Sequence, residues 1–98
     1  MKAYAQRQFA RSDFRTEGYE LNNIEGSFTG TLVFKKWGKK CNIIAYVEAD
    51  DGRKIVCTAF QKPDNYLGIQ DIEIGTKVEL TYGRTNRGTI RLNAVRTI

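Results

Sequence analysis

Residues 41–60, CNIIAYVEADDGRKIVCTAF, constrain the fold of this chain more than any other stretch. Apolar residues occupy alternate positions on both sides of an Asp-Gly turn at 50–52. A period of two places successive side chains on opposite faces of a strand, and Asp-Gly is a strong signal for a tight hairpin. The stretch therefore predicts an antiparallel β-hairpin with strands at 41–49 and 53–60.

Three further stretches extend this β-rich pattern along the chain. Each is rich in β-branched and aromatic residues, and they lie at 27–34, 76–82 and 89–98. The first contains Gly30, whose missing side chain would suit a bulge or a sharp bend. Residues 62–75 contain the single proline, an Asp/Asn helix-start signal and a terminal glycine, which predict a loop with a short helix.

The order of these elements predicts the fold class. Three strands, a short helix and a final two-stranded hairpin follow the order of the OB-fold, so we predict an all-β, five-stranded Greek-key barrel over residues 26–98. An SH3-like barrel is the rival fold, and it lacks a helix between its third and fourth strands. The expected core consists of Leu32, Ile43, Ala45, Val47, Ile55, Cys57, Val78, Leu80, Ile90 and Leu92.

Residues 1–25 do not follow either regular period. Their aromatic residues Tyr4, Phe9, Phe14 and Tyr19 recur every five positions, which matches neither a helical stripe nor the alternation of a strand. We therefore expect a separate N-terminal arm, which is either mobile or a short helix docked by two of these rings.

Length and composition limit the class of protein. Ninety-eight residues are enough for one hydrophobic core, and no apolar run approaches the roughly 20 residues of a membrane span. No signal-peptide core follows Met1, so a cytoplasmic protein without a membrane partner is expected. Two cysteines are too few for a disulfide scaffold, and we expect Cys41 and Cys57 to be free, buried thiols.

The net charge of +5 is concentrated in two stretches. Residues 26–47 and 80–98 contain eight of the 16 basic residues and none of the 11 acidic residues. A basic charge that is gathered in this way favours a local site for a polyanion.

The two basic stretches include the expected barrel loops. KKWGKK (35–40) joins the first and second predicted strands, and YGRTNRG (82–88) joins the fourth and fifth. OB-folds bind oligonucleotides and oligosaccharides with these two loops, and each loop here has an aromatic residue, Trp37 or Tyr82. Cations for phosphates beside flat rings for bases are typical of single-stranded nucleic-acid sites. The alternatives are that the loops are solvated hairpin tips, and that Trp37 plugs the barrel mouth.

The segment ADDGRKIVCTAFQ (49–61) resembles the hairpin of strands two and three in the single-stranded-DNA-binding domains of replication protein A, and the similarity extends over residues 46–98. The resemblance implies that Phe60 stacks on a base. An arginine that contacts DNA in that family is replaced here by Val56. The family's second stacking aromatic is also missing, with Tyr82 as its nearest substitute.

Strand alternation supports Phe60 independently of the resemblance. If Ile55, Cys57 and Ala59 face the core, the residues between them face outward with Phe60, and so does Tyr46 on the neighbouring strand. The opposite register would bury Phe60. The residues predicted to bind nucleic acid are Lys35, Lys36, Trp37, Lys39, Lys40, Tyr46, Lys54, Thr58, Phe60, Tyr82, Arg84, Arg87 and Arg91.

Sequence motifs for catalysis are missing. The chain has no histidine, no zinc-like cysteine spacing and no phosphate-binding glycine motif, so we expect neither an enzyme nor a cofactor or metal. The predicted function is non-catalytic binding of single-stranded nucleic acid, with DNA as the first expectation and RNA as the second, in replication, recombination or a mobile element. A second copy of the chain or a replication or recombination protein is a candidate partner. The alternative is an OB or SH3-like adaptor that binds an acidic protein.

Overall fold

The computed structural model describes residues 14–98, and predictions that fall on residues 1–13 lie outside this part of the chain. Six strands and one 3-10 segment make up the described fold, which confirms the all-β class. The elements are β1 Glu20–Leu21, β2 Gly26–Trp37, β3 Asn42–Ala49, β4 Lys54–Phe60, η1 Asn65–Asp71, β5 Lys77–Arg84 and β6 Ile90–Thr97. No helix in this part of the chain has the length and apolar character needed to cross a membrane.

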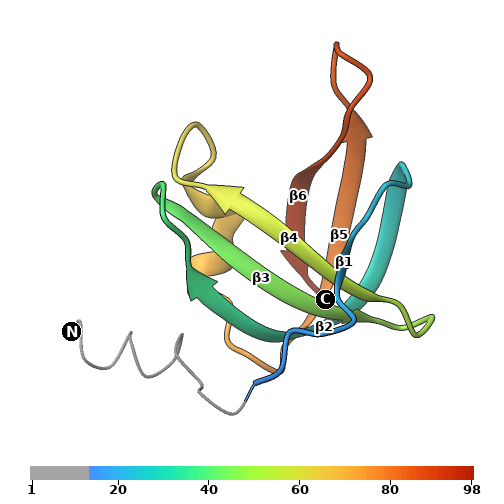
Figure 1. Ribbon diagram of the computed structural model, residues 1–98, viewed down its shortest axis with the longest axis vertical. Helices are drawn as coiled ribbons and strands as arrows, with labels where there is room; N and C mark the ends of the chain where they lie inside the picture. The colour runs from blue at the N-terminus through green and yellow to red at the C-terminus, as the bar shows by residue number, and fades with distance from the viewer. Residues whose placement is uncertain (1–13) are drawn as a thin grey trace.

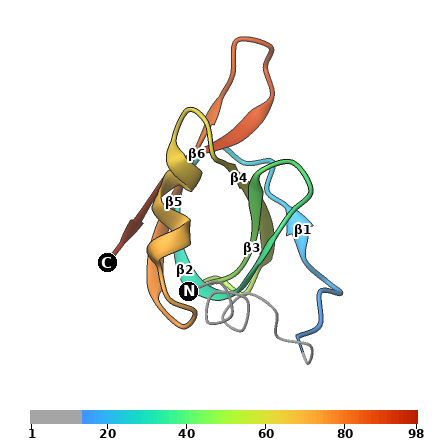
Figure 2. The same cartoon turned by 90° about the vertical axis from the view of Figure 1, so that its left-hand side faces the viewer.

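The strands form one curled sheet in the order β1-β4-β3-β2-β5-β6 (Figures 1 and 2). All neighbouring strands are antiparallel except β1, which pairs with β4 in parallel at Ile55 and Val56. The five predicted strands correspond to β2–β6, and the sixth strand, β1, was not predicted. In residues 14–98 the two edge strands, β1 and β6, do not pair with each other, so the described sheet is open on the side where these strands lie.

Strand β2 bends because it pairs with two neighbours. At Gly30 it faces Ala49 of β3 and Val78 of β5. A Cβ atom at Gly30 would lie 2.7 Å from the Glu48 carbonyl oxygen, so only glycine allows this approach. The register then shifts between Leu32 and Phe34, beyond the position at which a bulge was predicted.

Strand β2 extends further than predicted and continues beyond the register shift. The predicted strand ended at residue 34, whereas β2 continues to Trp37 and pairs Lys35 with Ala45. Residues opposite each other in an antiparallel pair share a face of the sheet. Lys35 therefore lies on the inner face with Ala45, and Lys36 lies on the outer face with Ile44.

The inner face of the sheet forms the core as the alternation predicted, with one exception. Nine of the ten expected core residues are buried, and Ile90 is partly buried against them. The short helix was also predicted, and η1 contributes the buried residues Tyr66 and Ile69. Of the two cysteines, Cys57 is buried as expected, but Cys41 is exposed in the loop after β2, so its predicted burial was wrong.

The N-terminal segment packs on the outer face of the sheet. The Phe14 ring stacks on Phe34 with centroids 4.5 Å apart, and it lies 5.3 Å from the Tyr46 ring. Tyr19 packs edge-on against Tyr46 at 5.2 Å. Residues 14–21 therefore cross from β2 to the edge of β4, where β1 pairs.

Candidate nucleic-acid interface

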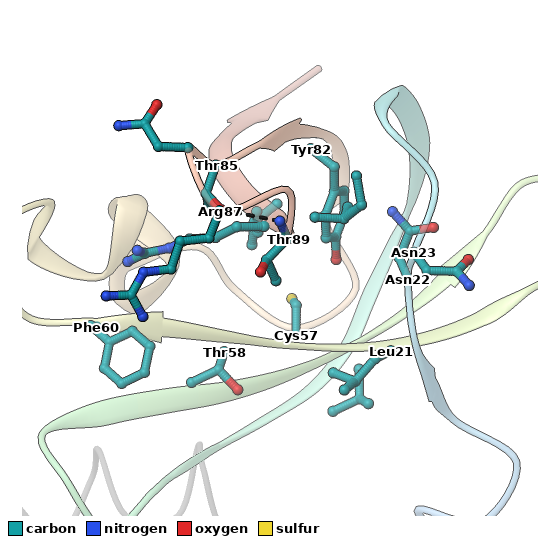
Figure 3. Close-up of a pocket in the computed structure, with 15 residues that line it drawn as sticks. Leu21, Asn22, Asn23, Cys57, Thr58, Phe60, Tyr82, Thr85, Arg87 and Thr89 are labelled. Atoms are coloured by element: carbon teal, nitrogen blue, oxygen red, sulfur yellow. Dashed lines mark hydrogen bonds between the residues drawn. The ribbon is translucent and has the colours of Figure 1, made fainter.

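A cleft of 820 Å³ occupies the open side of the sheet, between β4 and the β5–β6 hairpin (Figure 3). Beyond Val56, β4 has no strand partner on this side in the described chain. None of the residues that line the cleft is acidic, and two of them, Arg87 and Arg91, are basic. The lining residues are Leu21, Asn22, Asn23, Val56, Cys57, Thr58, Phe60, Tyr82, Thr85, Asn86, Arg87, Thr89, Ile90, Arg91 and Leu92.

The β5–β6 hairpin is held by its own hydrogen bonds. The backbone N–H of Thr85 donates to the Thr89 carbonyl at 2.8 Å, and that of Gly88 donates to the Thr85 carbonyl at 2.9 Å. Gly88 has a φ of +85°, which favours glycine in this turn. Arg84 Nη1 also donates to the Gly88 carbonyl at 2.7 Å, and its Nε lies 3.6 Å from a Glu25 carboxylate oxygen.

Because of these bonds, the two arginines of the hairpin turn, Arg84 and Arg87, have different surroundings. Arg84 bonds to the turn and pairs with Glu25, so its side chain stabilises the loop. Arg87 is exposed, and its side chain extends from the hairpin toward Phe60 in Figure 3. The hydrogen-bonded turn thus leaves Arg87 exposed beside the cleft.

The floor of the cleft is apolar and neutral. Cys57 and Tyr82 are both buried and point toward each other (Figure 3). Burial raises the pKa of the Cys57 thiol to about 12. Burial, followed by the effect of Cys57, raises the pKa of the Tyr82 hydroxyl. At neutral pH, neither group adds charge to the floor.

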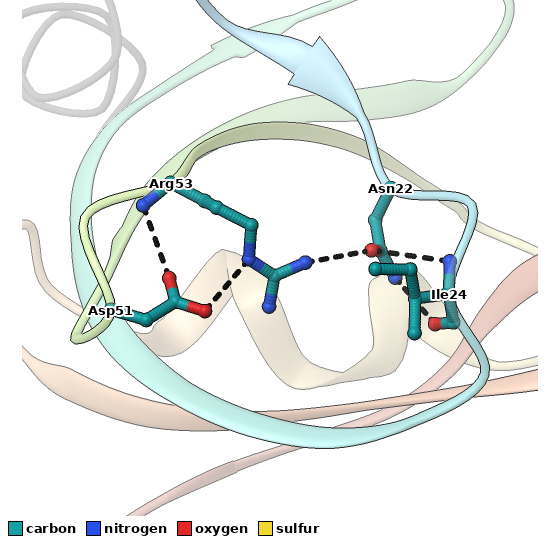
Figure 4. Close-up of polar contacts among 4 residues, drawn as sticks. All are labelled: Asn22, Ile24, Asp51 and Arg53. Carbon is teal, nitrogen blue, oxygen red and sulfur yellow. Dashed lines mark hydrogen bonds and ion pairs between the residues drawn. The ribbon is translucent and has the colours of Figure 1, made fainter.

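The wall opposite the hairpin is the linker between β1 and β2, and Arg53 holds it in place (Figure 4). Arg53 Nη1 donates to Asn22 Oδ1 at 3.2 Å, while its Nε bonds an Asp51 carboxylate oxygen at 2.9 Å. Asn22 Nδ2 in turn donates to the Ile24 carbonyl at 2.8 Å. The guanidinium also lies 4.7 Å from the Phe28 ring centroid. The β3–β4 turn therefore positions Asn22 and its neighbour Asn23 beside the cleft.

The residues of KKWGKK separate onto different surfaces. Lys36 is half-buried on the outer face, with its Nζ 5.8 Å from the Tyr46 ring centroid. Trp37 is the last residue of β2, where it packs edge-on against Tyr66 and stays 41 % exposed. Lys39 and Lys40 are exposed in the loop. This loop ends beside Phe60, because Asn42 pairs with Phe60 and Gln61 N–H donates to the Cys41 carbonyl.

Lys35 was predicted to bind nucleic acid, and the structure corrects this prediction. Its side chain is 0 % exposed, and its Nζ donates to the carbonyls of Ile69, Gln70 and Ile72. Burial lowers the pKa of the ammonium, while Asp71 and Glu73 act in the opposite direction. Lys35 therefore joins β2 to the end of η1 and lies away from any ligand surface.

The other twelve predicted residues lie in different parts of the structure. Thr58, Phe60, Tyr82, Arg87 and Arg91 come together in the cleft, and Phe60 is 42 % exposed. Lys36, Tyr46 and Lys54 lie on the outer face of the sheet, where Phe14 and Tyr19 cover Tyr46. Trp37 lies at the end of β2 against Tyr66, and Lys39 and Lys40 lie in the loop that ends beside Phe60. Arg84 braces the hairpin.

Burial also limits two of the predicted aromatic contacts. Tyr46 faces outward as predicted, but Phe14 and Tyr19 leave it only 6 % exposed. Tyr82 is 5 % exposed and stacks on Phe28, so it is part of the floor and cannot replace an exposed stacking ring.

Sequence reasoning missed the linker wall of the cleft, Leu21, Asn22 and Asn23. Their only local signal is an Asn-Asn pair between two apolar residues, which is typical of a turn. That signal does not show which part of the sheet the turn will face.

In residues 14–98, no group of three or more Cys, Asp or Glu side chains is placed to hold a metal ion. No protein-family model, no curated protein and no solved structure matches this chain.

Proposed function

We propose that the curled sheet is an OB-type barrel and that its open side binds single-stranded nucleic acid without catalysis. The observation that supports this function best is the cleft itself. It combines an apolar floor, the exposed ring of Phe60 and two arginines, and it has no acidic lining residue.

Each part of the cleft matches one part of a nucleotide. Unpaired bases offer flat apolar faces, for which Phe60 and the floor provide contact area. Phosphates require cations, which Arg87 and Arg91 provide on the hairpin side. Lys39 and Lys40 add charge in the loop that ends beside Phe60. The bases of a duplex are paired and stacked inside the helix, where their faces cannot reach Phe60. The cleft should therefore prefer single strands.

Fluorescence anisotropy with labelled oligo-dT, oligo-rU and a DNA duplex tests the proposal. We expect single strands to bind more tightly than the duplex. Phe60→Ala should weaken oligo-dT binding by about 5- to 150-fold, the value of one stacked base. Ile98→Ala removes an exposed apolar side chain outside the cleft and should leave binding unchanged.

The same titration separates this function from the protein-adaptor alternative. An adaptor that recognises charge alone should bind a poly-glutamate peptide as tightly as oligo-dT, and Phe60→Ala should affect both equally. Such a result, or a folded Phe60→Ala variant with full affinity, would contradict the proposed cleft.

A further inference from the structure

Segment 14–19 covers an aromatic surface that faces outward from the sheet. Phe34 and Tyr46 are paired neighbours on β2 and β3, and both point away from the core. The Phe14 ring lies nearly parallel to Phe34, at 4.5 Å and 18°. A flat ring already occupies a stacking position on this face.

The segment is held there by its rings and not by its backbone. In the described structure, the one backbone hydrogen bond of residues 14–18 is internal, from Tyr19 N–H to the Thr16 carbonyl at 3.4 Å. Tyr19 adds a side-chain bond to a Glu48 carboxylate oxygen at 3.2 Å. Gly18, with a φ of +86°, precedes the point where the chain becomes tied to β4 as β1. The Phe14 end can therefore lift while β1 stays paired.

Two cations flank the covered surface. Lys36 Nζ lies 5.8 Å from the Tyr46 ring, and Lys54 Nζ lies 5.6 Å from the Tyr19 ring. A nucleotide needs an aromatic ring for its base and a positive charge for its phosphate. The rings lie under the segment and the two lysines lie beside it.

The covered surface is continuous with the cleft. On β4 the outward residues run Val56, Thr58, Phe60, and Val56 pairs with Tyr46 on β3. Phe60 lies four residue steps along the strand from Val56, which corresponds to about 13 Å. A single strand leaving Phe60 could reach Tyr46 across the half-buried residues between them.

We propose that Phe34 and Tyr46 form a second base-stacking site, and that Phe14 occupies it in the free protein. A single strand bound at the cleft extends over the outer face and exchanges one of its bases for the Phe14 ring. This inference rests on the proposed function. It adds a form of regulation, because segment 14–19 competes with the single strand for the same surface.

Competition predicts an effect of opposite sign to that of a binding residue. Phe14→Ala removes the competitor, so a long oligo-dT should bind about 2- to 13-fold more tightly, the factor that corresponds to one aromatic pair. A short oligo-dT that fills only the cleft should bind this variant and the native protein equally. Thr16→Ala, an exposed control in the same segment, should change neither affinity.

Fluorine NMR of protein labelled with fluorophenylalanine provides a readout that does not require a stable Phe14→Ala variant. The Phe14 resonance, assigned by its loss in Phe14→Leu, should narrow and move to a solvent-exposed position when long oligo-dT saturates the protein. The Phe28 resonance should stay broad, because Phe28 is stacked on Tyr82 within the fold.

The outcomes separate this inference from the proposed function. If oligo-dT binds, depends on Phe60, and leaves both the Phe14 resonance and the Phe14→Ala affinity unchanged, the second site is wrong and the cleft stands. Weaker binding by Phe14→Ala would also overturn the exchange. If oligo-dT does not bind the native protein, both proposals fail.

Discussion

Burial gives neighbouring lysines opposite roles at the scale of single residues. Lys35 and Lys36 are adjacent on β2, yet the alternation of the strand directs them to opposite faces. Lys35 donates to three carbonyls in the interior, whereas Lys36 lies beside an aromatic ring on the outside. A basic residue in the sequence therefore adds charge to the protein surface only if the strand register places its side chain on the outside.

Replacing each lysine by methionine should separate these roles. Lys35→Met removes the side-chain donor to the carbonyls of Ile69, Gln70 and Ile72, of which Ile69 keeps the Ile72 N–H, and we expect the free energy of unfolding to fall by about 1–3 kcal/mol. Lys36→Met, the matched control, should change it by no more than about 0.5 kcal/mol. Urea unfolding followed by circular dichroism measures both. Equal stability of the two variants would show that the buried ammonium contributes nothing to the fold.

Cys57 should make the fold sensitive to alkaline pH. The ordinary pKa of its thiol is 9.0, and burial in the fold raises it to about 12. Between these values the unfolded chain binds fewer protons than the folded one, so stability falls as pH rises, by up to about 1.4 kcal/mol per pH unit. Lys35 acts in the opposite sense, because its lowered pKa makes stability rise with pH below 10.5.

A comparison with Cys57→Ala cancels the effect of Lys35, which is common to both proteins, and leaves that of the thiol and of its contact with Tyr82. Between pH 9 and 10, native stability relative to that of the variant should decline with increasing pH, as measured by urea unfolding at each pH. Parallel stability curves over this range would contradict the assigned role of Cys57.

At the scale of elements, the sequence predicted those parts of the fold that follow a local period. Strands β3 and β4 and their turn were predicted correctly because alternation and Asp-Gly are local signals. The outward position of Phe60 follows from the same alternation and is confirmed. The cleft residues on β4 could be predicted for this reason.

The errors concern elements whose position depends on distant contacts. Strand β2 continues beyond residue 34, and Lys35 faces inward after a register shift that no local sequence pattern predicts. Strand β1 is two residues long, and its pairing with β4 joins positions 20 and 55. The spacing of Phe14 and Tyr19 suits an irregular segment crossing a sheet, and the surface that it covers is defined only when β2 and β3 pair. Tertiary contacts, not propensities, decide these features.

At the scale of the whole molecule, charge is divided between the two ends of the sheet. The β3–β4 turn is at the end of β4 opposite Phe60, and its acids are paired: Asp50 with Lys77 and Asp51 with Arg53. On β6, Arg96 pairs with Glu79. The exposed bases Arg87 and Arg91 line the cleft, and the exposed Lys39 and Lys40 lie in the loop that ends beside Phe60. The side chains that line the cleft therefore include basic groups and no acidic group.

The salt dependence of binding should report this division. If Lys39, Lys40, Arg87 and Arg91 each neutralise one phosphate, log K for oligo-dT should fall with log salt at a slope of about −3. Arg87→Gln should make the slope shallower by about 0.7. Arg96→Gln, which removes an arginine paired with Glu79, should leave it unchanged, and so should Lys35→Met, because that charge is buried. Anisotropy titrations from low to physiological salt measure these slopes. An affinity that is insensitive to salt would show that the protein does not neutralise the phosphates of oligo-dT. Equal effects of Arg87→Gln and Arg96→Gln would show that the phosphates do not bind at the cleft.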